Sequence, residues 1–147
     1  MSIESKLTEL GITLPEAPAP AANYVPWVIS GNLLFVSGQI SALKGRLGDD
    51  LAVEQGAEAA RGCGLSLLAQ ARAAAGSLDR IARVVKLTGF VASTPDFTDQ
   101  PEVVNGCSDL MVEVFGDKGR HARAAVSAAA LPRGVAVEIE AIFQIER

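Results

Sequence analysis

The alternating stretch VAVEIEAIFQI, at residues 135–145, decides the fold class of this chain. Every second residue, counted from the first, is apolar: Val135, Val137, Ile139, Ala141, Phe143 and Ile145. Successive side chains of a strand point to opposite sides, so this pattern predicts a long strand with one buried face. The intervening positions include Glu138 and Glu140, which need water, a partner or a ligand.

Further strands are predicted upstream of this one. Residues 123–129 are mostly apolar, and the turn residues Leu131-Pro132-Arg133-Gly134 join them to the last strand. Because a tight turn usually links an antiparallel pair, we expect these two strands to be neighbours. Residues 83–92 (RVVKLTGFVA) predict another strand. Residues 24–29 and 33–40 predict a hairpin around Ser30-Gly31-Asn32.

Two helices are predicted between these strands, at residues 51–75 and 101–116. Apolar and small residues recur in both at steps of three and four, which is typical of a helix with one buried face. The resulting order, β-β-α-β-α-β-β, predicts an α+β fold with both helices packed on one face of a mixed sheet. The other face carries small or apolar residues, among them Ala125 and Ile142, so we expect it to mediate self-association.

A leader at residues 1–22 precedes the main domain, which we place at residues 23–147. Ile3, Leu7 and Leu10 have helical spacing, and Gly11 is suited to end a short helix. The following stretch PEAPAPAA, residues 15–22, cannot be helical throughout because each proline removes a backbone donor. We therefore expect an accessory helix followed by a linker.

Composition narrows the function classes. The chain has 147 residues, 13 basic and 17 acidic, so its net charge of −4 gives no reason to expect a nucleic acid or an anionic membrane as partner. One histidine and two cysteines without a CxxC spacing argue against a histidine-based metal site and a disulfide framework. We expect no metal and no cofactor. No secretory signal and no apolar run of roughly 20 residues is present, so a cytoplasmic protein is expected.

Few residues are suited to chemistry. Cys63 and Cys107 lie on or beside the apolar helical stripes and are expected to be core thiols, and His121 is expected in a solvated loop. Arg123 opens one apolar strand and Glu138 lies inside another. The two charges are consistent with a buried ion pair, or with a solvated face for Glu138. They are also suited to binding a carboxylate and to holding a water molecule.

Several separate motifs, in order along the chain, resemble the RidA (YjgF-like) family. They are LFVSGQI at residues 34–40, Asn105 on the second helix, Ala122-Arg123-x-Ala125-Val126, Leu131-Pro132, and VEIEAI at residues 137–142. The resemblance runs from about Tyr24 to the C-terminus. The leader is similar to that of a longer, less characterised branch of the family.

The resemblance implies a chorismate-mutase-like fold and a homotrimer with three clefts between adjacent subunits. It also implies a site. Arg123 matches the arginine that grips a substrate carboxylate, and Glu138 matches the glutamate that positions an attacking water. The pocket residues that it implies are Tyr24, Ser37, Gly38, Asn105 and Ala125. Ala125 stands where many members have cysteine, and His121 replaces a common proline.

The activity implied is hydrolysis of reactive enamines and imines of the 2-aminoacrylate type, to 2-keto acids and ammonia, without metal or cofactor. One alternative is a non-catalytic binder of small carboxylates or 2-keto acids in the same cleft. Another is an endoribonuclease or translation inhibitor, to which an acidic chain with one Tyr and one Trp is poorly suited.

Overall fold

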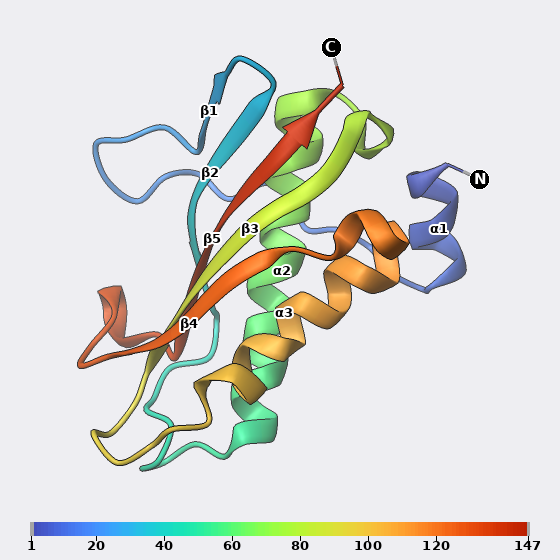
Figure 1. Cartoon of the computed structure of the whole chain (residues 1–147). Helices are drawn as coiled ribbons and strands as arrows, with labels where there is room; N and C mark the ends of the chain where they lie inside the picture. Colours follow the sequence, from blue (N-terminus) through green and yellow to red (C-terminus); the bar gives the residue numbers. More distant parts are fainter. Residues whose placement is uncertain (1, 147) are drawn as a thin grey trace.

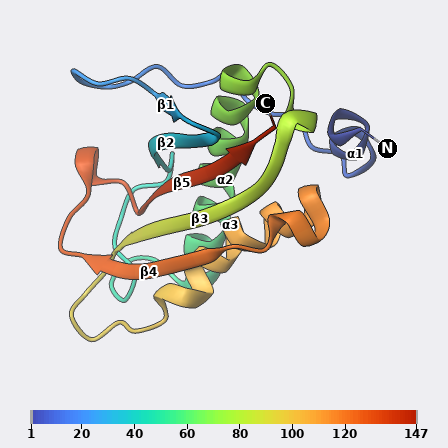
Figure 2. The ribbon, with the colours of Figure 1, turned by 45° about the horizontal axis from the view of Figure 1, so that its top comes forward.

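A twisted five-stranded sheet with both long helices on one of its faces forms the body of the protein (Figures 1 and 2). The computed structural model describes residues 2–146. The strands are β1 (Trp27–Ser30), β2 (Leu33–Ile40), β3 (Ile81–Ala92), β4 (Ala122–Ala128) and β5 (Val137–Ile145). The helices are α1 (Ile3–Glu9), α2 (Val53–Ala75) and α3 (Gln100–Phe115), with short 3-10 turns η1 (Leu78–Arg80), η2 (Gly116–Gly119) and η3 (Pro132–Gly134). The predicted α+β class is confirmed.

The strand order is β1-β2-β5-β3-β4, and only β3 and β4 run parallel. The expectation that the last two strands are neighbours is therefore wrong, because β3 lies between β4 and β5. The helix α3 connects β3 to β4, and a crossover helix of this kind returns the chain parallel to the strand it left. Both sides of β5 are occupied by β2 and β3, so β4 takes the free edge of β3.

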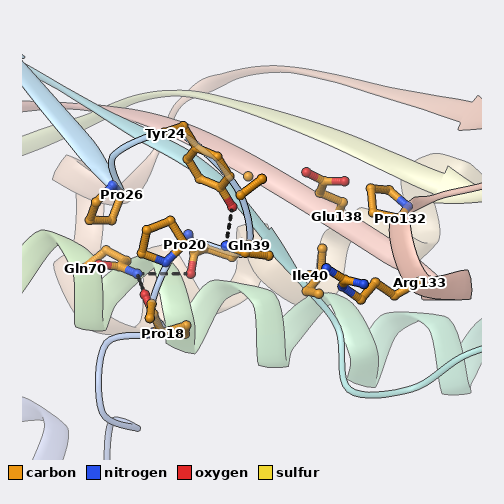
Figure 3. A pocket seen from close by; sticks show the side chains of 14 residues that line it. Pro18, Pro20, Tyr24, Pro26, Gln39, Ile40, Gln70, Pro132, Arg133 and Glu138 are labelled. Carbon is orange, nitrogen blue, oxygen red and sulfur yellow. Dashed lines mark hydrogen bonds between the residues drawn. The ribbon is translucent and has the colours of Figure 1, made fainter.

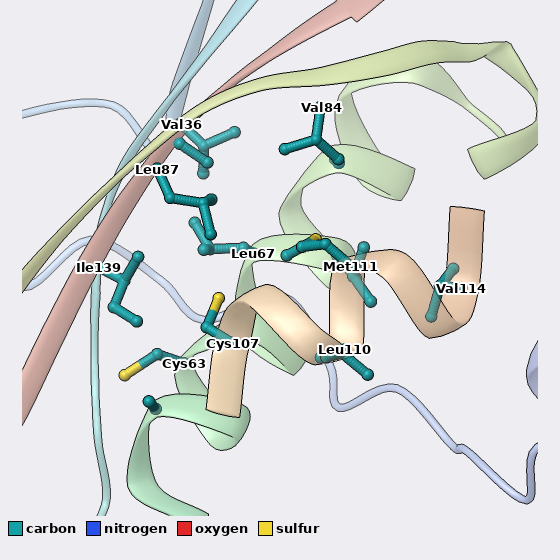
Figure 4. Close-up of a cluster of buried hydrophobic side chains, with 14 of the residues drawn as sticks. Val36, Cys63, Leu67, Val84, Leu87, Cys107, Leu110, Met111, Val114 and Ile139 are labelled. Carbon is teal, nitrogen blue, oxygen red and sulfur yellow. The ribbon is translucent and has the colours of Figure 1, made fainter. Parts of the chain in front are cut away.

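The core lies between the sheet and the two long helices (Figure 4). It is built from small and branched side chains, including Leu67, Leu87 and Ile139, all fully buried. Cys63 and Cys107 lie in it too, so the prediction of core thiols is confirmed. Burial raises the pKa of the Cys63 thiol to about 12, which leaves it protonated and unreactive at neutral pH.

The helices α2 and α3 pack closely at two glycines, Gly64 and Gly106. A Cβ added to Gly106 would overlap the carbonyl group of Ala57 on α2, and one added to Gly64 would lie 2.8 Å from a Cδ atom of Leu110. The observed spacing of α2 and α3 therefore requires glycine at position 106.

No helix of the described residues covers the other face of the sheet (Figure 2). Strand registers place four residues in one row across it, in the order Ile40, Glu138, Phe90, Val126. Ile40 and Val126 are 39% and 44% exposed, which is high for large apolar side chains. Ala125 is not on this face, contrary to expectation, because it packs against the core on the helix side.

The leader folds against the rest of the chain. The helix α1 packs against α3 and η1, and its Leu7 is buried (Figure 1). The backbone N–H of Ile3 donates to Asp79 at 2.7 Å, and Arg72 on α2 pairs with Glu4 at 3.1 Å. Residues 10–26 then run past α2 to the start of β1.

Candidate functional site

The predicted site residues gather in two separate pockets. One, here called the Arg123 pocket, is a shallow hollow of about 260 Å³ that contains Arg123 and Asn105. The other, the Glu138 pocket, has about 450 Å³ and contains Glu138, Gly38 and Tyr24. Ser37 and Ala125 line neither of them.

The two pockets are separated by the sheet. Arg123 is in register with Leu87 and Ala141, both buried on the helix side, whereas Glu138 is in register with Ile40 and Phe90 on the open face. Paired residues of neighbouring strands point to the same face. One chain therefore holds the two charged groups on opposite faces and cannot bring them to one ligand.

Arg123 is held by neutral groups. Its guanidinium donates to the Ser108 hydroxyl at 3.1 Å and to the Pro101 carbonyl at 3.2 Å, both on α3. Within residues 2–146 it forms no ion pair with a carboxylate. The alternative of a buried Arg123–Glu138 pair is therefore wrong. The guanidinium is therefore held in one orientation, and no carboxylate of the described residues pairs with its charge, which is free to bind a ligand.

Ser108 and His121 extend this arrangement. The Nδ1 atom of His121 lies 2.6 Å from the Gly119 carbonyl, which can only accept, so Nδ1 carries the proton. The Nε2 atom of neutral His121 then accepts from the Ser108 hydroxyl at 2.8 Å, and the Ser108 oxygen accepts from Arg123. Burial lowers the pKa of His121, and the nearby charge of Arg123 lowers it further, so the neutral form prevails at pH 7.

Sequence reasoning missed Ser108 and assigned His121 to solvent. A signal for Ser108 was present, because it follows Asn105 by three positions on a helix and so shares its face. His121 is half-buried in the pocket wall rather than solvated.

Glu138 lies against the backbone of β2. A Cβ added to Gly38 would overlap its Oε2 atom, so only glycine leaves space for the carboxylate there. Burial among apolar neighbours raises the pKa of Glu138, and the like charge of Glu140 raises it further. A carboxylate of raised pKa is a better proton acceptor from water than an ordinary one.

Ser37 supports the Glu138 pocket from behind. Its hydroxyl donates to the Val25 carbonyl at 2.8 Å and its N–H donates to the Pro26 carbonyl at 2.9 Å. These two bonds fix the chain that carries Tyr24. Ser37 is therefore a positioning residue in this structure, and not a pocket-lining one.

Other kinds of site are not found. No group of three or more His, Cys, Asp or Glu suited to a metal ion occurs in residues 2–146. In the same part of the chain no helix is long and apolar enough to cross a membrane.

Comparisons with known proteins point to one family. The model of the YjgF/chorismate mutase-like family, whose description also names endoribonuclease, matches residues 4–141. Protein TCP17 of Trypanosoma cruzi is 50% identical over 97% of this chain and 94% of its own length. The crystal structure of protein Atu1372 from Agrobacterium tumefaciens, of unknown function, has a TM-score of 0.91 at 51% identity and covers 98% of this chain and 92% of its own.

A more distant structure contains a bound amino acid. TdcF of E. coli was crystallised with bound serine, and it matches with a TM-score of 0.65 at 27% identity over 90% of this chain and 94% of its own. The family match over most of the chain leads to one conclusion: this protein is a member of the YjgF/RidA-like family.

Proposed function

We propose that this protein hydrolyses reactive 2-imino acids, formed from enamines of the 2-aminoacrylate type, to 2-keto acids and ammonia. Imine deaminase activity is known for some members of the family. The observation that carries the proposal is the Arg123 guanidinium, which is fixed by neutral acceptors, has no carboxylate partner in the described chain and borders an open pocket. A guanidinium in this state is suited to bidentate binding of a carboxylate.

The reaction needs only positioning and one base. The enamine first tautomerises to the imine. Arg123 fixes the substrate carboxylate, and Glu138 accepts a proton from water as the water oxygen bonds to the imine carbon. Glu138 returns this proton to the nitrogen, which completes a carbinolamine. Its carbon–nitrogen bond then breaks as the hydroxyl proton passes to the nitrogen, so that ammonia leaves and a carbonyl remains. Water is consumed, and no oxidant or reductant is needed.

Two copies of the chain are required for this chemistry. Arg123 and Glu138 lie on opposite faces of one sheet, so we assign a complete site to the Arg123 pocket of one subunit and the Glu138 pocket of its neighbour. Members of the family are usually oligomeric. The exposed apolar side chains on the Glu138 face support such a contact. A homotrimer, with three shared clefts, is the assembly we propose.

The test is a coupled assay. A threonine dehydratase supplies the unstable intermediate, and release of 2-ketobutyrate is followed with and without this protein. We expect acceleration by the wild type and its loss in Arg123→Ala. Arg61→Ala is the control, since Arg61 lies on α2 and pairs only with Glu113 at 3.0 Å. Acceleration that survives in Arg123→Ala contradicts the proposal.

A non-catalytic binder of small 2-keto acids is the second candidate. One observation favours it: Ser108 and Pro101 of the same chain already orient Arg123 for a carboxylate, and binding needs no base. Calorimetry with 2-ketobutyrate separates the two, because binding without any turnover assigns this second function. A ribonuclease is not favoured, because a net charge of −4 gives no electrostatic reason to expect RNA binding.

A further inference from the structure

One wall of the Glu138 pocket is built by the leader. Five consecutive residues, Pro18–Ala22, form one wall, and Tyr24 and Pro26 continue it. In Figure 3, Glu138, Pro132 and Arg133 lie at one end, and Pro18, Pro20 and Gln70 lie at the other. The pocket therefore extends from the reacting carboxylate to a distant region lined mostly by proline and alanine.

The leader wall is fixed in place at two points. The amide nitrogen of Gln70 on α2 donates to the Pro18 carbonyl at 2.6 Å, and the N–H of Ala21 donates to the Tyr24 hydroxyl at 3.3 Å. Gln70 is only 1% exposed, and its nitrogen also lies 3.4 Å from the Gln39 amide oxygen. With its nitrogen committed to these acceptors, the Gln70 oxygen has no partner within residues 2–146. A buried glutamine is thus used to hold the leader, at the cost of one unpaired acceptor.

The space exceeds what the smallest substrates need. An imino acid derived from alanine has six non-hydrogen atoms. If each takes about 30 Å³, the volume of one water molecule in the liquid, they fill roughly a third to two-fifths of the Glu138 pocket. The remaining volume lies toward Pro18 and Pro20, where proline and alanine side chains form one wall and Gln70 is the polar residue beside them. A short substrate leaves this region to water, whereas a long apolar side chain displaces that water and gains free energy by burial.

We infer that the leader makes this protein selective for imino and keto acids with long or branched apolar side chains, such as those derived from leucine or methionine. The inference rests on the proposed function for the position of the substrate carboxylate. It goes beyond that function in assigning the side-chain pocket to residues 18–22.

The experiment compares imino acids of different size. An amino-acid oxidase generates them from alanine, 2-aminobutyrate, leucine and methionine, and the kcat/KM for each is measured. The wild type is expected to favour the leucine-derived over the alanine-derived imino acid by about tenfold or more, at roughly 1–3 kcal/mol for each methylene group recognised. Ala19→Trp and Ala21→Trp, which place a large side chain in the wall, are expected to reduce this ratio to near one.

Glu16→Trp is the matched control, because it adds the same bulk to an exposed leader residue that does not line the pocket. A wild type that favours the small substrate, or a ratio unchanged in both alanine variants, overturns the inference. Calorimetry with 2-ketobutyrate and 4-methyl-2-oxopentanoate keeps the two proposals distinguishable. Preference for the larger keto acid without any turnover supports the side-chain pocket and rejects the deaminase.

Discussion

At the scale of single residues, the Arg123–Ser108–His121 chain of hydrogen bonds makes carboxylate binding sensitive to pH. The pKa of His121 lies below its ordinary value, so the ring is neutral at pH 7 and Nε2 accepts from Ser108. As the pH falls through this lowered pKa, Nε2 gains a proton and the Ser108 hydroxyl can no longer donate to it.

We predict that 2-ketobutyrate binds more tightly as the pH falls through the pKa of His121, because the protonated ring adds a second positive charge beside Arg123, and that His121→Gln loses most of this dependence. Ser108→Ala is expected to weaken binding about tenfold at pH 7, because one hydrogen bond that orients the guanidinium is removed. Calorimetry over a pH series measures both. Ser66→Ala, on α2, is the control. A His121→Gln profile that matches the wild type rules out the assigned role of the ring.

Glu138 presents the opposite case, since its pKa is raised. The folded state disfavours the charged carboxylate, so ionisation of Glu138 destabilises the protein above the carboxyl's unfolded pKa, and the penalty vanishes below it. We predict that Glu138→Gln abolishes turnover and raises the melting temperature at pH 7.5, but not at pH 3.5. Thermal unfolding at the two pH values measures this. Glu54→Gln, on the exposed side of α2, should change neither property.

At the scale of elements, the spacing of α2 and α3 depends on Gly106. We predict that Gly106→Ala lowers the free energy of unfolding by about 1–3 kcal/mol, because the new methyl group would overlap the Ala57 carbonyl. Gly62→Ala on α2 is the matched control. Its Cβ would meet no atom within 4 Å, so it should stabilise the helix by about 0.5–1 kcal/mol. Denaturant unfolding distinguishes the two, and equal effects would contradict the proposed close approach.

Elements were predictable where the pattern is local. The alternation of residues 137–145 and the apolar stripes of α2 and α3 identify these elements. In each of them the buried residues recur with the period of a strand or of a helix. The position of β4 was not predictable in this way. The turn residues at 131–134 resemble a hairpin, but the crossover through α3 and the occupied sides of β5 decide the pairing, and both are long-range properties. Gln70 is a polar residue within a buried stripe, and its partner Pro18 is 52 residues away.

At the scale of the whole molecule, the main feature is that Arg123 and Glu138 lie on opposite faces of one sheet. Motifs indicated the individual residues Arg123 and Glu138, but only the register across three strands shows that they face opposite ways. Sequence patterns contain no information on which face of an edge strand is turned toward a second copy.

This arrangement predicts complementation between inactive variants. Arg123→Ala and Glu138→Gln are each expected to be inactive alone. Unfolding and refolding them together at equal amounts would generate clefts with both groups intact, in about one quarter of cases for random cyclic assembly. Turnover of the mixture near that fraction of wild type supports the shared site. A mixture as inactive as its components contradicts it.

Because the two charged groups lie on opposite faces of one sheet, a defective chain also affects the intact chains that assemble with it. In the proposed trimer, a single chain that carries both the Arg123→Ala and the Glu138→Gln changes inactivates both of the clefts that it helps to form, which are two of the three in the trimer. Such a chain would have a dominant-negative effect in a cell that also makes the intact protein. A chain defective in one group alone would remove only one cleft per copy.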